Sequence, residues 1–170
     1  MLNSIMKSFF YYTPTALIII IILFVPRLHA QEPELAGQAS VIDGDTIEIG
    51  YIKIRLHGID APESTQWCYD QKSVQYPCGR RAAIALSDFI GRGTVSCQPH
   101  DIDRYGRTIA KCRVRGLDIE KWLVKNGHAV AYRKYSSDYV ADEIDAKSNQ
   151  VGIWSGFFEL PSNFRHHKRH

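Results

Sequence analysis

The stretch that decides the fold is Val41-Ile-Asp-Gly-Asp-Thr-Ile47, which is followed by Ile54-Arg-Leu-His-Gly-Ile-Asp-Ala-Pro-Glu63. In both segments β-branched residues flank a short polar turn, which predicts β-strands around an Asp-Gly turn. A third segment, Asp103-Arg-Tyr-Gly-Arg107, has the composition of another turn. These turns place three carboxylates and two guanidinium groups near strand ends, and such groups can hold a hard cation beside a phosphodiester.

Each charged residue in these turns has a chemical reason to act on an anionic phosphate. The carboxylates of Asp45 and Asp60 suit calcium or magnesium, and the sequence has no zinc-type spacing of Cys and His. Arg55 and Arg107 offer planar, permanently charged donors that pair with phosphate oxygens. Glu63 is the candidate general base, because a nearby carboxylate can accept a proton from attacking water.

Taken singly, each residue has a plainer explanation. Asp-Gly-Asp is more often a hairpin turn than a metal site. The segment from Asp60 to Glu63 also fits a strand end followed by an N-capped turn. Arg55 would gain little by pairing with a surface carboxylate. The joint occurrence of all these pieces in one small chain is what favours a catalytic site.

The three motifs, in this order, closely resemble the staphylococcal nuclease (thermonuclease) family. The later segments Leu123-Val-Lys-Asn-Gly-His-Ala-Val-Ala-Tyr132 and Gly152-Ile-Trp154 also look like that family, so the resemblance spans Ala39 to Trp154. It implies an α+β fold, an OB-type five-stranded β-barrel with about three helices. It also implies hydrolysis of DNA and/or RNA to products with 3′-phosphate ends.

The resemblance assigns roles residue by residue. It implies that Asp45, Asp60 and the backbone carbonyl of Ala61 bind calcium. It also assigns Arg55, Glu63 and Arg107 to catalysis, and it aligns Tyr132 with a nucleotide contact. Arg104 and Tyr105 are further candidates for substrate binding. Tyr135 lies three residues after Tyr132, whereas the family enzyme spaces its nucleotide-contacting tyrosines two apart. The alternative is a catalytically silent module of the same fold that binds nucleic acid or a protein.

The N-terminal segment predicts export. Lys7 precedes an unbroken apolar run over residues 16–25, and a small residue follows at Ala30. This is the pattern of a secretory signal over residues 1–30. An uncleaved anchor facing outside the cytoplasm is the alternative, and only then is a membrane expected as a partner. We expect a periplasmic or extracellular protein.

The four cysteines predict two disulfides in an exported chain of this size. If residues 95–99 and 108–114 form an antiparallel hairpin, Cys97 and Cys112 fall opposite each other on one face. That pairing leaves Cys68 to join Cys78 and to close a surface loop. Each disulfide is expected to stabilise the fold by about 3 kcal/mol in the chain-entropy model.

One domain over residues 38–160 is expected between a polar lead-in at residues 31–37 and a basic, His-rich tail at residues 161–170. The tail is more simply explained as a solvated, disordered end than as a functional contact. Trp122 and Trp154 are expected in the core.

The hydrophobic pattern predicts five strands and three helices. The predicted strands are 40–42, 46–49, 51–57, 95–99 and 108–114. The predicted helices are 80–90, one from Ile119 to Gly127, and one from Val140 to Gly152.

Net charge limits the partner only weakly. Without residues 1–30 the chain has 19 basic and 18 acidic residues, so a nucleic-acid affinity must come from a local patch. The candidates for that patch are Arg55, Arg104, Arg107, Arg133 and Lys134, with the tail as a helper. DNA and/or RNA is the expected substrate, and a monomer without an obligate protein partner is expected.

Overall fold

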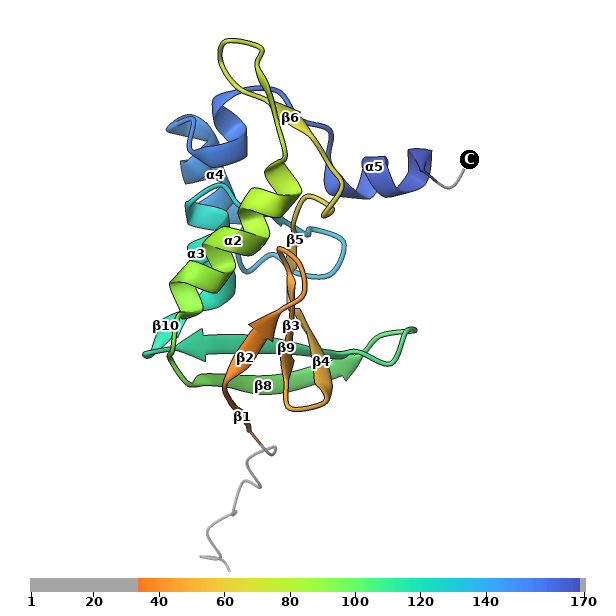
Figure 1. Cartoon of the computed structure of the whole chain (residues 1–170), viewed down its shortest axis with the longest axis vertical. Coiled ribbons are helices and arrows are strands. Elements are labelled where there is room, and N and C mark those ends of the chain that lie inside the picture. Colours follow the sequence, from red (N-terminus) through yellow and green to blue (C-terminus); the bar gives the residue numbers. More distant parts are fainter. Residues whose placement is uncertain (1–33, 169–170) are drawn as a thin grey trace, which may run out of the picture. The chain divides into compact units, whose positions relative to one another are not determined.

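The computed structural model describes residues 34–168, which form a curled mixed sheet and four α-helices (Figure 1). The sheet has seven strands in the order β1-β8-β9-β4-β3-β2, and β10 pairs with β9 off this path. Only the pair β4 and β9 is parallel. The strands are β1 (Leu35–Gly37), β2 (Ala39–Val41), β3 (Thr46–Ile49), β4 (Ile52–Leu56), β8 (Val95–Ile102), β9 (Thr108–Val114) and β10 (Leu117–Asp118).

The register of the central strands brings the motif segments together. β3 and β4 form a hairpin in which Thr46 lies opposite Arg55. Its turn contains Gly50 with a φ of 62°, a conformation that glycine adopts without steric cost. β4 then pairs with β9 so that Ile54 is the partner of Thr108. The first residue of β3, the end of β4 and the first residue of β9 therefore meet at one place.

Two small sheets extend this framework. β5 (Ile59–Asp60) pairs with β11 (Val130–Ala131), and Asp60 is the partner of Val130. β6 (Cys68–Tyr69) pairs with β7 (Gln75–Tyr76). The first pairing holds the Asp60 motif against the chain that leads to Tyr132.

The helices begin and end where local chemistry favours it. α2 (Cys78–Ile90) buries Ala82, Leu86 and Ile90 on one face and ends at Gly91, whose φ is 54°. α3 (Ile119–Lys125) begins after Asp118, whose side chain accepts a hydrogen bond from the amide of Lys121 at 2.7 Å. The other helices are α4 (Val140–Ser148), the short 3₁₀-helix η2 (Gly152–Ser155), and α5 (Pro161–His167), which has proline at its start.

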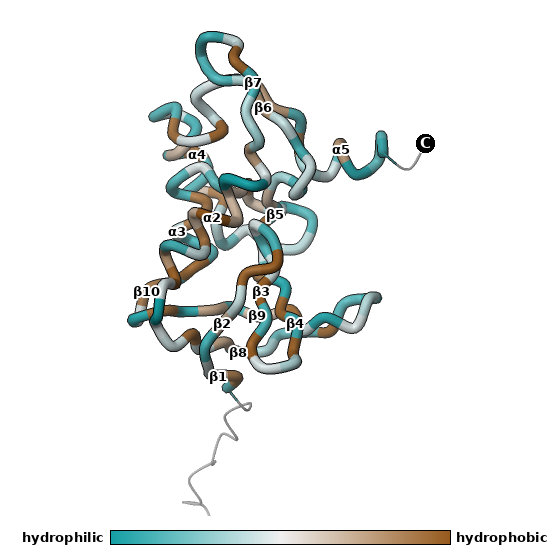
Figure 2. The backbone as a smooth tube through the Cα atoms, viewed as in Figure 1, coloured by the Kyte–Doolittle hydropathy of each residue, from teal (hydrophilic) through white to brown (hydrophobic). Residues whose placement is uncertain are grey.

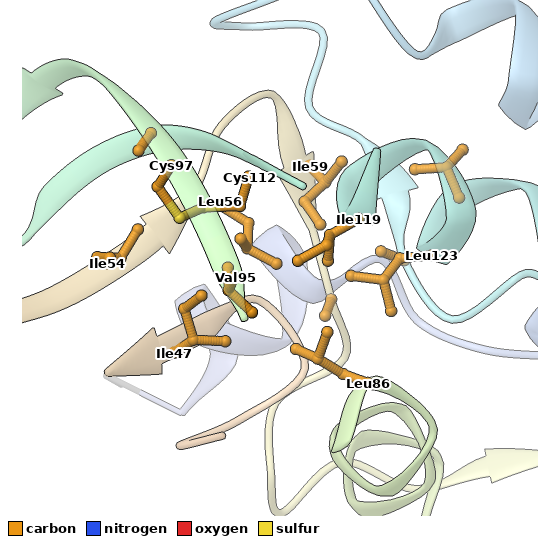
Figure 3. Packing of buried hydrophobic residues seen from close by; sticks show 14 of the residues in the cluster. Ile47, Ile54, Leu56, Ile59, Leu86, Val95, Cys97, Cys112, Ile119 and Leu123 are labelled. Atoms are coloured by element: carbon orange, nitrogen blue, oxygen red, sulfur yellow. A yellow bond between two sulfur atoms is a disulfide. The ribbon is translucent and has the colours of Figure 1, made fainter. Parts of the chain in front are cut away.

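The main core lies between the sheet and the helices α2 and α3. Apolar residues line these elements in Figure 2, and Figure 3 shows Ile47, Ile54 and Leu56 of the sheet packed with Leu86 of α2 and Leu123 of α3. All five side chains are at most 1% exposed. Burial of each such side chain contributes about 1.5–3 kcal/mol, so this cluster holds the helices on the sheet.

Both predicted disulfides are present. Cys97 lies directly opposite Cys112 in the β8–β9 hairpin, and the two are bonded (Figure 3). Cys68 is bonded to Cys78, which joins β6 to the first residue of α2. The hairpin register derived from sequence is therefore correct at the cysteines.

The α+β, OB-type fold class is confirmed, but several details of the prediction are wrong. The sheet has seven strands rather than five, because β1 and β10 add short edge pairs that carry little sequence pattern. Residues 35–37 of the expected lead-in form β1. A fourth α-helix, α5, replaces the expected disordered tail through His167. The two tryptophans are half-buried against the two apolar clusters, as expected for packing residues.

The predicted signal or anchor segment, residues 1–30, lies outside the described residues, as do the last two residues of the tail. Within residues 34–168, no helix has the length and apolar character needed to cross a membrane.

Candidate active site

The Asp-Gly-Asp turn fixes the first carboxylate of the candidate active site. The side chain of Asp43 accepts a hydrogen bond from the amide of Asp45 at 3.0 Å, and Asp45 itself is 4% exposed. Gly44 is required for space rather than for a positive φ, because a Cβ there would lie 2.7 Å from the Cβ of Ala61 and 2.9 Å from that of Ala82. The turn therefore packs directly on the Asp60 motif and on α2.

Arg55 joins the two predicted metal ligands. Its Nη1 donates to Asp45 Oδ1 at 2.6 Å, and its Nη2 donates to Asp60 Oδ1 at 3.0 Å. The amide of Ala61 donates to the other oxygen of Asp45 at 2.9 Å. Arg55 thus links Asp45 and Asp60, and the calcium-binding role of the two carboxylates stays a prediction.

Glu63 is held through its backbone. Its amide donates to the side-chain oxygen of Gln66 at 3.1 Å, and a Cβ on Gly79 would overlap the carbonyl oxygen of Glu63. The first turn of α2 is therefore packed against this backbone. The side chain of Glu63 is 38% exposed and extends into the cleft described below. We name Asp45, Asp60 and Glu63 the carboxylate cluster.

Arg107 stands at the edge of the cluster rather than within it. Its Nε and Nη2 donate to Asp103 Oδ2 at 2.8 and 2.7 Å. Its Nη1 lies 3.3 Å from the hydroxyl of Thr46, which in turn donates to Asp45 at 3.2 Å. The turn between β8 and β9 thereby reaches the carboxylate cluster through one hydroxyl group.

A second guanidinium on the cluster comes from α5, and sequence analysis missed it. Arg165 Nη1 donates to Asp60 Oδ1 and to Glu63 Oε1, both at 2.8 Å, and its Nη2 donates to Asp60 Oδ2 at 2.9 Å. The only sequence signal for α5 is the proline that begins it, because the rest of the segment looks like a polar tail.

Burial and charge shift the pKa values of these groups. Burial raises the pKa of Asp60 and the charge of Asp45 adds to it, although the hydrogen bonds from Arg165 oppose the change. Burial alone would lower the pKa of Arg165, but its bonds to Asp60 and Glu63 raise it overall. Desolvation likewise opposes a raised pKa at Arg55, and the charges of Asp45 and Asp60 prevail. Both arginines are cations at any working pH.

Asp45 and Glu63 of the carboxylate cluster line a cleft of about 920 Å³, together with Arg55 and Arg165. This volume lies within the range of ligand sites, about 300–1,000 Å³. The predicted substrate residues Arg104, Tyr105 and Tyr132 line it, together with Lys134 and Tyr135. Tyr132 and Tyr135 meet edge to face with ring centroids 4.8 Å apart, so both tyrosines face the cleft despite their altered spacing.

Two further observations refine the predicted basic patch. Arg133, a candidate for the basic patch, does not line the cleft and pairs with Glu143 at 2.5 Å. Histidines that sequence analysis missed, His57 and His100, do line it, with ring centroids 4.5 Å apart.

The donor set fits a hard cation. Asp45 and Asp60 offer only oxygen atoms and both pair with Arg55, and oxygen donors suit calcium or magnesium better than zinc. Within residues 34–168, no group of three or more His, Cys, Asp or Glu side chains is arranged to hold a metal ion. Backbone carbonyls and water would have to supply the remaining ligands. The ligand role of the Ala61 carbonyl stays a prediction.

The amino-acid sequence matches one protein family and several curated proteins. Residues 53–156 match the family model described as Staphylococcal nuclease homologue. The sequence is 42% identical over 128 residues to a "Succinoglycan biosynthesis protein ExoI" of Rhizobium meliloti (strain 1021), covering 74% of this chain and 66% of that protein.

Other relatives are named for nuclease activity. An "Uncharacterized endonuclease" of Haemophilus influenzae is 30% identical over 89% of this chain and 84% of its own length. A "Micrococcal nuclease" of Shigella flexneri is 33% identical over 68% of this chain and 70% of its own length. A "Probable staphylococcal-like nuclease CAN3" of rice is 32% identical, but the match spans only 29% of that protein.

Proposed function

The chain belongs to the family of staphylococcal nuclease homologues, and from this premise we propose that it is an exported, calcium-dependent nuclease. Its substrate is DNA, RNA or both, and its products end in a 3′-phosphate, as the family resemblance implies. The observation that carries the proposal is that Arg55 bonds both Asp45 and Asp60 beside a cleft lined with basic and aromatic side chains.

The residues of the chain divide the chemistry among them. Asp45 and Asp60 would hold the calcium ion, which supplies positive charge to the phosphate when it is bound. Arg55 and Arg107 donate hydrogen bonds to phosphate oxygens, where negative charge increases as water attacks. Glu63 accepts the proton of the attacking water once Arg165 no longer engages its carboxylate.

The outer part of the cleft suits a polynucleotide strand. Arg104 and Lys134 offer charge to backbone phosphates, while Tyr132 and Tyr135 present aromatic rings on which bases stack. Such contacts bind nucleic acid without base-specific hydrogen bonds. Sequence preference is therefore expected to be weak.

Export is proposed from two features of the chain. The apolar run over residues 16–25 has the length of a signal peptide core. Two disulfides within a chain of this size are typical of oxidising compartments.

The proposal is tested by digesting single- and double-stranded DNA and RNA with the purified, oxidised protein, in calcium and in excess chelator. Calcium should support cleavage, and Asp45→Ala should abolish it, because a carboxylate of an oxygen-only site is removed. The matched control is Asp88→Ala, which removes an exposed carboxylate from α2 and should leave activity intact. Full cleavage in chelator would contradict the proposal.

A catalytically silent binding module is the second candidate, and one observation favours it: Arg165 engages both Asp60 and Glu63. A silent module would bind oligonucleotides with the same affinity whether or not calcium is present. It would also release no product under any metal condition. The two candidates therefore separate in the same digestion experiment.

A further inference from the structure

Arg165 occupies the same carboxylate oxygens that a metal would need. α5 directs this side chain between Asp60 and Glu63, and it is 27% exposed there. The contact is bidentate on Asp60, with one nitrogen on each oxygen at 2.8 and 2.9 Å. Paired charge-assisted hydrogen bonds of this geometry are among the strongest polar contacts in proteins.

The lone pairs of Asp60 show that Arg165 and a metal ion need the same positions on this carboxylate. A carboxylate oxygen has two lone pairs, and Oδ1 of Asp60 accepts one bond from Arg55 and one from Arg165. Oδ2 accepts another from Arg165. Because the Asp60 side chain is 2% exposed, it cannot turn toward solvent to offer other directions. A metal ion therefore gains full access to Asp60 only when Arg165 leaves.

The charges lead to the same conclusion. The three carboxylates of the cluster face the guanidinium groups of Arg55 and Arg165, which leaves one net negative charge. Without Arg165 the cluster carries two, the charge that a divalent cation neutralises. Arg165 also repels Arg55, because both guanidinium groups share Asp60 Oδ1.

α5 is attached in a way that allows this release. It has seven residues, of which only Pro161 is buried. Isolated helices shorter than about 12–15 residues are marginal in water, so α5 depends on its contacts for its position. Apart from Arg165, those include an exposed bond from Lys168 to the hydroxyl of Thr65 at 3.2 Å. Upstream, Gln66 donates to the carbonyl of Glu159 at 2.6 Å and anchors the chain that leads into α5.

We infer that Arg165 and a divalent cation compete for Asp60 while Arg165 also holds Glu63, so that α5 is an autoinhibitory latch on the active site. The inference rests on the proposed function only for the premise that the carboxylate cluster takes a metal. With the latch closed, Arg165 holds the candidate general base and blocks one metal ligand. Metal binding and release of α5 are then a single coupled equilibrium.

Calcium titration of the oxidised protein by calorimetry tests the competition without reference to cleavage. Arg165→Ala should bind calcium about tenfold more tightly or better, the scale of one displaced charge-assisted contact. Arg165→Lys should fall between the two, because it keeps the charge but loses the bidentate contact. Lys168→Ala is the matched control on the same helix, and its calcium affinity should rise far less than that of Arg165→Ala, because it loses only one exposed hydrogen bond and leaves Asp60 engaged.

A second measurement keeps the test valid if Arg165→Ala fails to fold. The side-chain Nη–H signals of Arg165 in ¹⁵N NMR spectra, assigned by their loss in Arg165→Lys, should lose protection from exchange when the parent protein is saturated with calcium, because Nη1 and Nη2 make the bonds to Asp60 and Glu63. An unchanged signal at saturation would overturn the latch.

The possible outcomes separate the latch from the nuclease proposal. Tighter calcium binding by Arg165→Ala supports the latch even if no variant cleaves nucleic acid. Equal calcium affinity in the parent and Arg165→Ala overturns it. If Arg165→Ala also binds oligonucleotide more weakly, Arg165 is a phosphate contact instead. Equal tightening in Lys168→Ala also overturns it, because general electrostatics would then explain the effect.

Discussion

The two ends of the cleft are built in different ways. At the inner end, Arg55 is bonded to two carboxylates whose side chains are 6% and 2% exposed, so each group is fixed by the others. At the outer end, Tyr105 on the β8–β9 turn is 64% exposed, and Arg107 is held mainly by Asp103 four residues away. The inner end is a preorganised polar cluster, and the outer end is an exposed surface that a long substrate can cover.

This contrast predicts where substitutions affect catalysis and where they affect folding. Groups at the inner end support one another, so the removal of one leaves a buried partner without its hydrogen bonds. Groups at the outer end contact local partners and solvent, so their loss affects mainly the substrate. Arg55 and Arg107 have the same predicted chemical role and differ only in these surroundings, which makes them the natural pair to compare.

The largest effect is expected at Glu63, the most exposed member of the carboxylate cluster. Glu63→Gln keeps the size of the side chain and removes the base, so turnover should fall by about 10²–10⁴-fold. Calcium affinity should not fall, because Glu63 is not among the proposed ligands. Single-turnover cleavage and calcium titration check the two parts. Normal turnover under conditions where chemistry limits the rate would sink the assignment of Glu63 as the base.

Arg55→Lys and Arg107→Lys test the contrast itself. Each should lower turnover by about a hundredfold or more, because a point charge replaces a rigid bidentate donor to the transition state. Only Arg55→Lys should also lower the melting temperature, since Lys cannot bond both Asp45 and Asp60 in place of Arg. Thermal melts beside single-turnover rates measure both effects. Equal melting temperatures for the two variants would show that the inner end is no more interdependent than the outer.

The residues at the inner end of the cleft show which features could be predicted from the sequence. The inner residues follow strand patterns and turn chemistry over a short stretch, so Asp45, Arg55 and Asp60 were identifiable together with the strands that carry them. The disulfide between Cys97 and Cys112 followed from hairpin register alone. Elements held by local periodicity were predictable in this way.

Features that depend on long-range contacts were not predictable. Arg165 reaches Asp60 across a separation of 105 residues, and no local pattern in α5 indicates that contact. β1 becomes a strand only because the edge of β8 is available to it. Gln66 links Glu63 to Glu159 from within a segment of turn-like composition. In each case tertiary packing decides the structure, and propensity contributes little.

The two disulfides offer a smaller test, because one stabilises each part of the site. Cys97–Cys112 ties the strands that support the outer turn, and Cys68–Cys78 closes the loop after Glu63. Replacing either pair by serine should lower the free energy of unfolding by about 3 kcal/mol in the chain-entropy model. Cleavage at low temperature should largely persist, since no cysteine contacts the carboxylate cluster. Denaturant titration measures the loss, and immediate inactivation upon mild reduction would contradict the prediction.

The smallest expected effect is a pH dependence of stability that originates at His57, a buried residue that lines the cleft. Burial lowers the pKa of His57 below 6.5, as do the charges of His100 and Lys111, while Asp138 acts in the opposite direction. The folded state therefore favours the neutral ring.

The stability that the neutral ring of His57 contributes is complete above pH 6.5. It is lost as the pH falls below 6.5 through the lowered pKa of the folded protein, because the unfolded chain takes up the proton first. His57→Gln should flatten the decline of melting temperature below pH 6.5. His128→Gln should flatten it independently, because it removes a half-buried histidine that stacks on Trp122 and whose pKa is also lowered by desolvation. Melting curves at a series of pH values would show both changes, and additive flattening in the double variant would confirm that His57 acts through its own surroundings. An unaltered pH profile in His57→Gln would mean that His57 binds its proton as readily in the folded protein as in the unfolded chain.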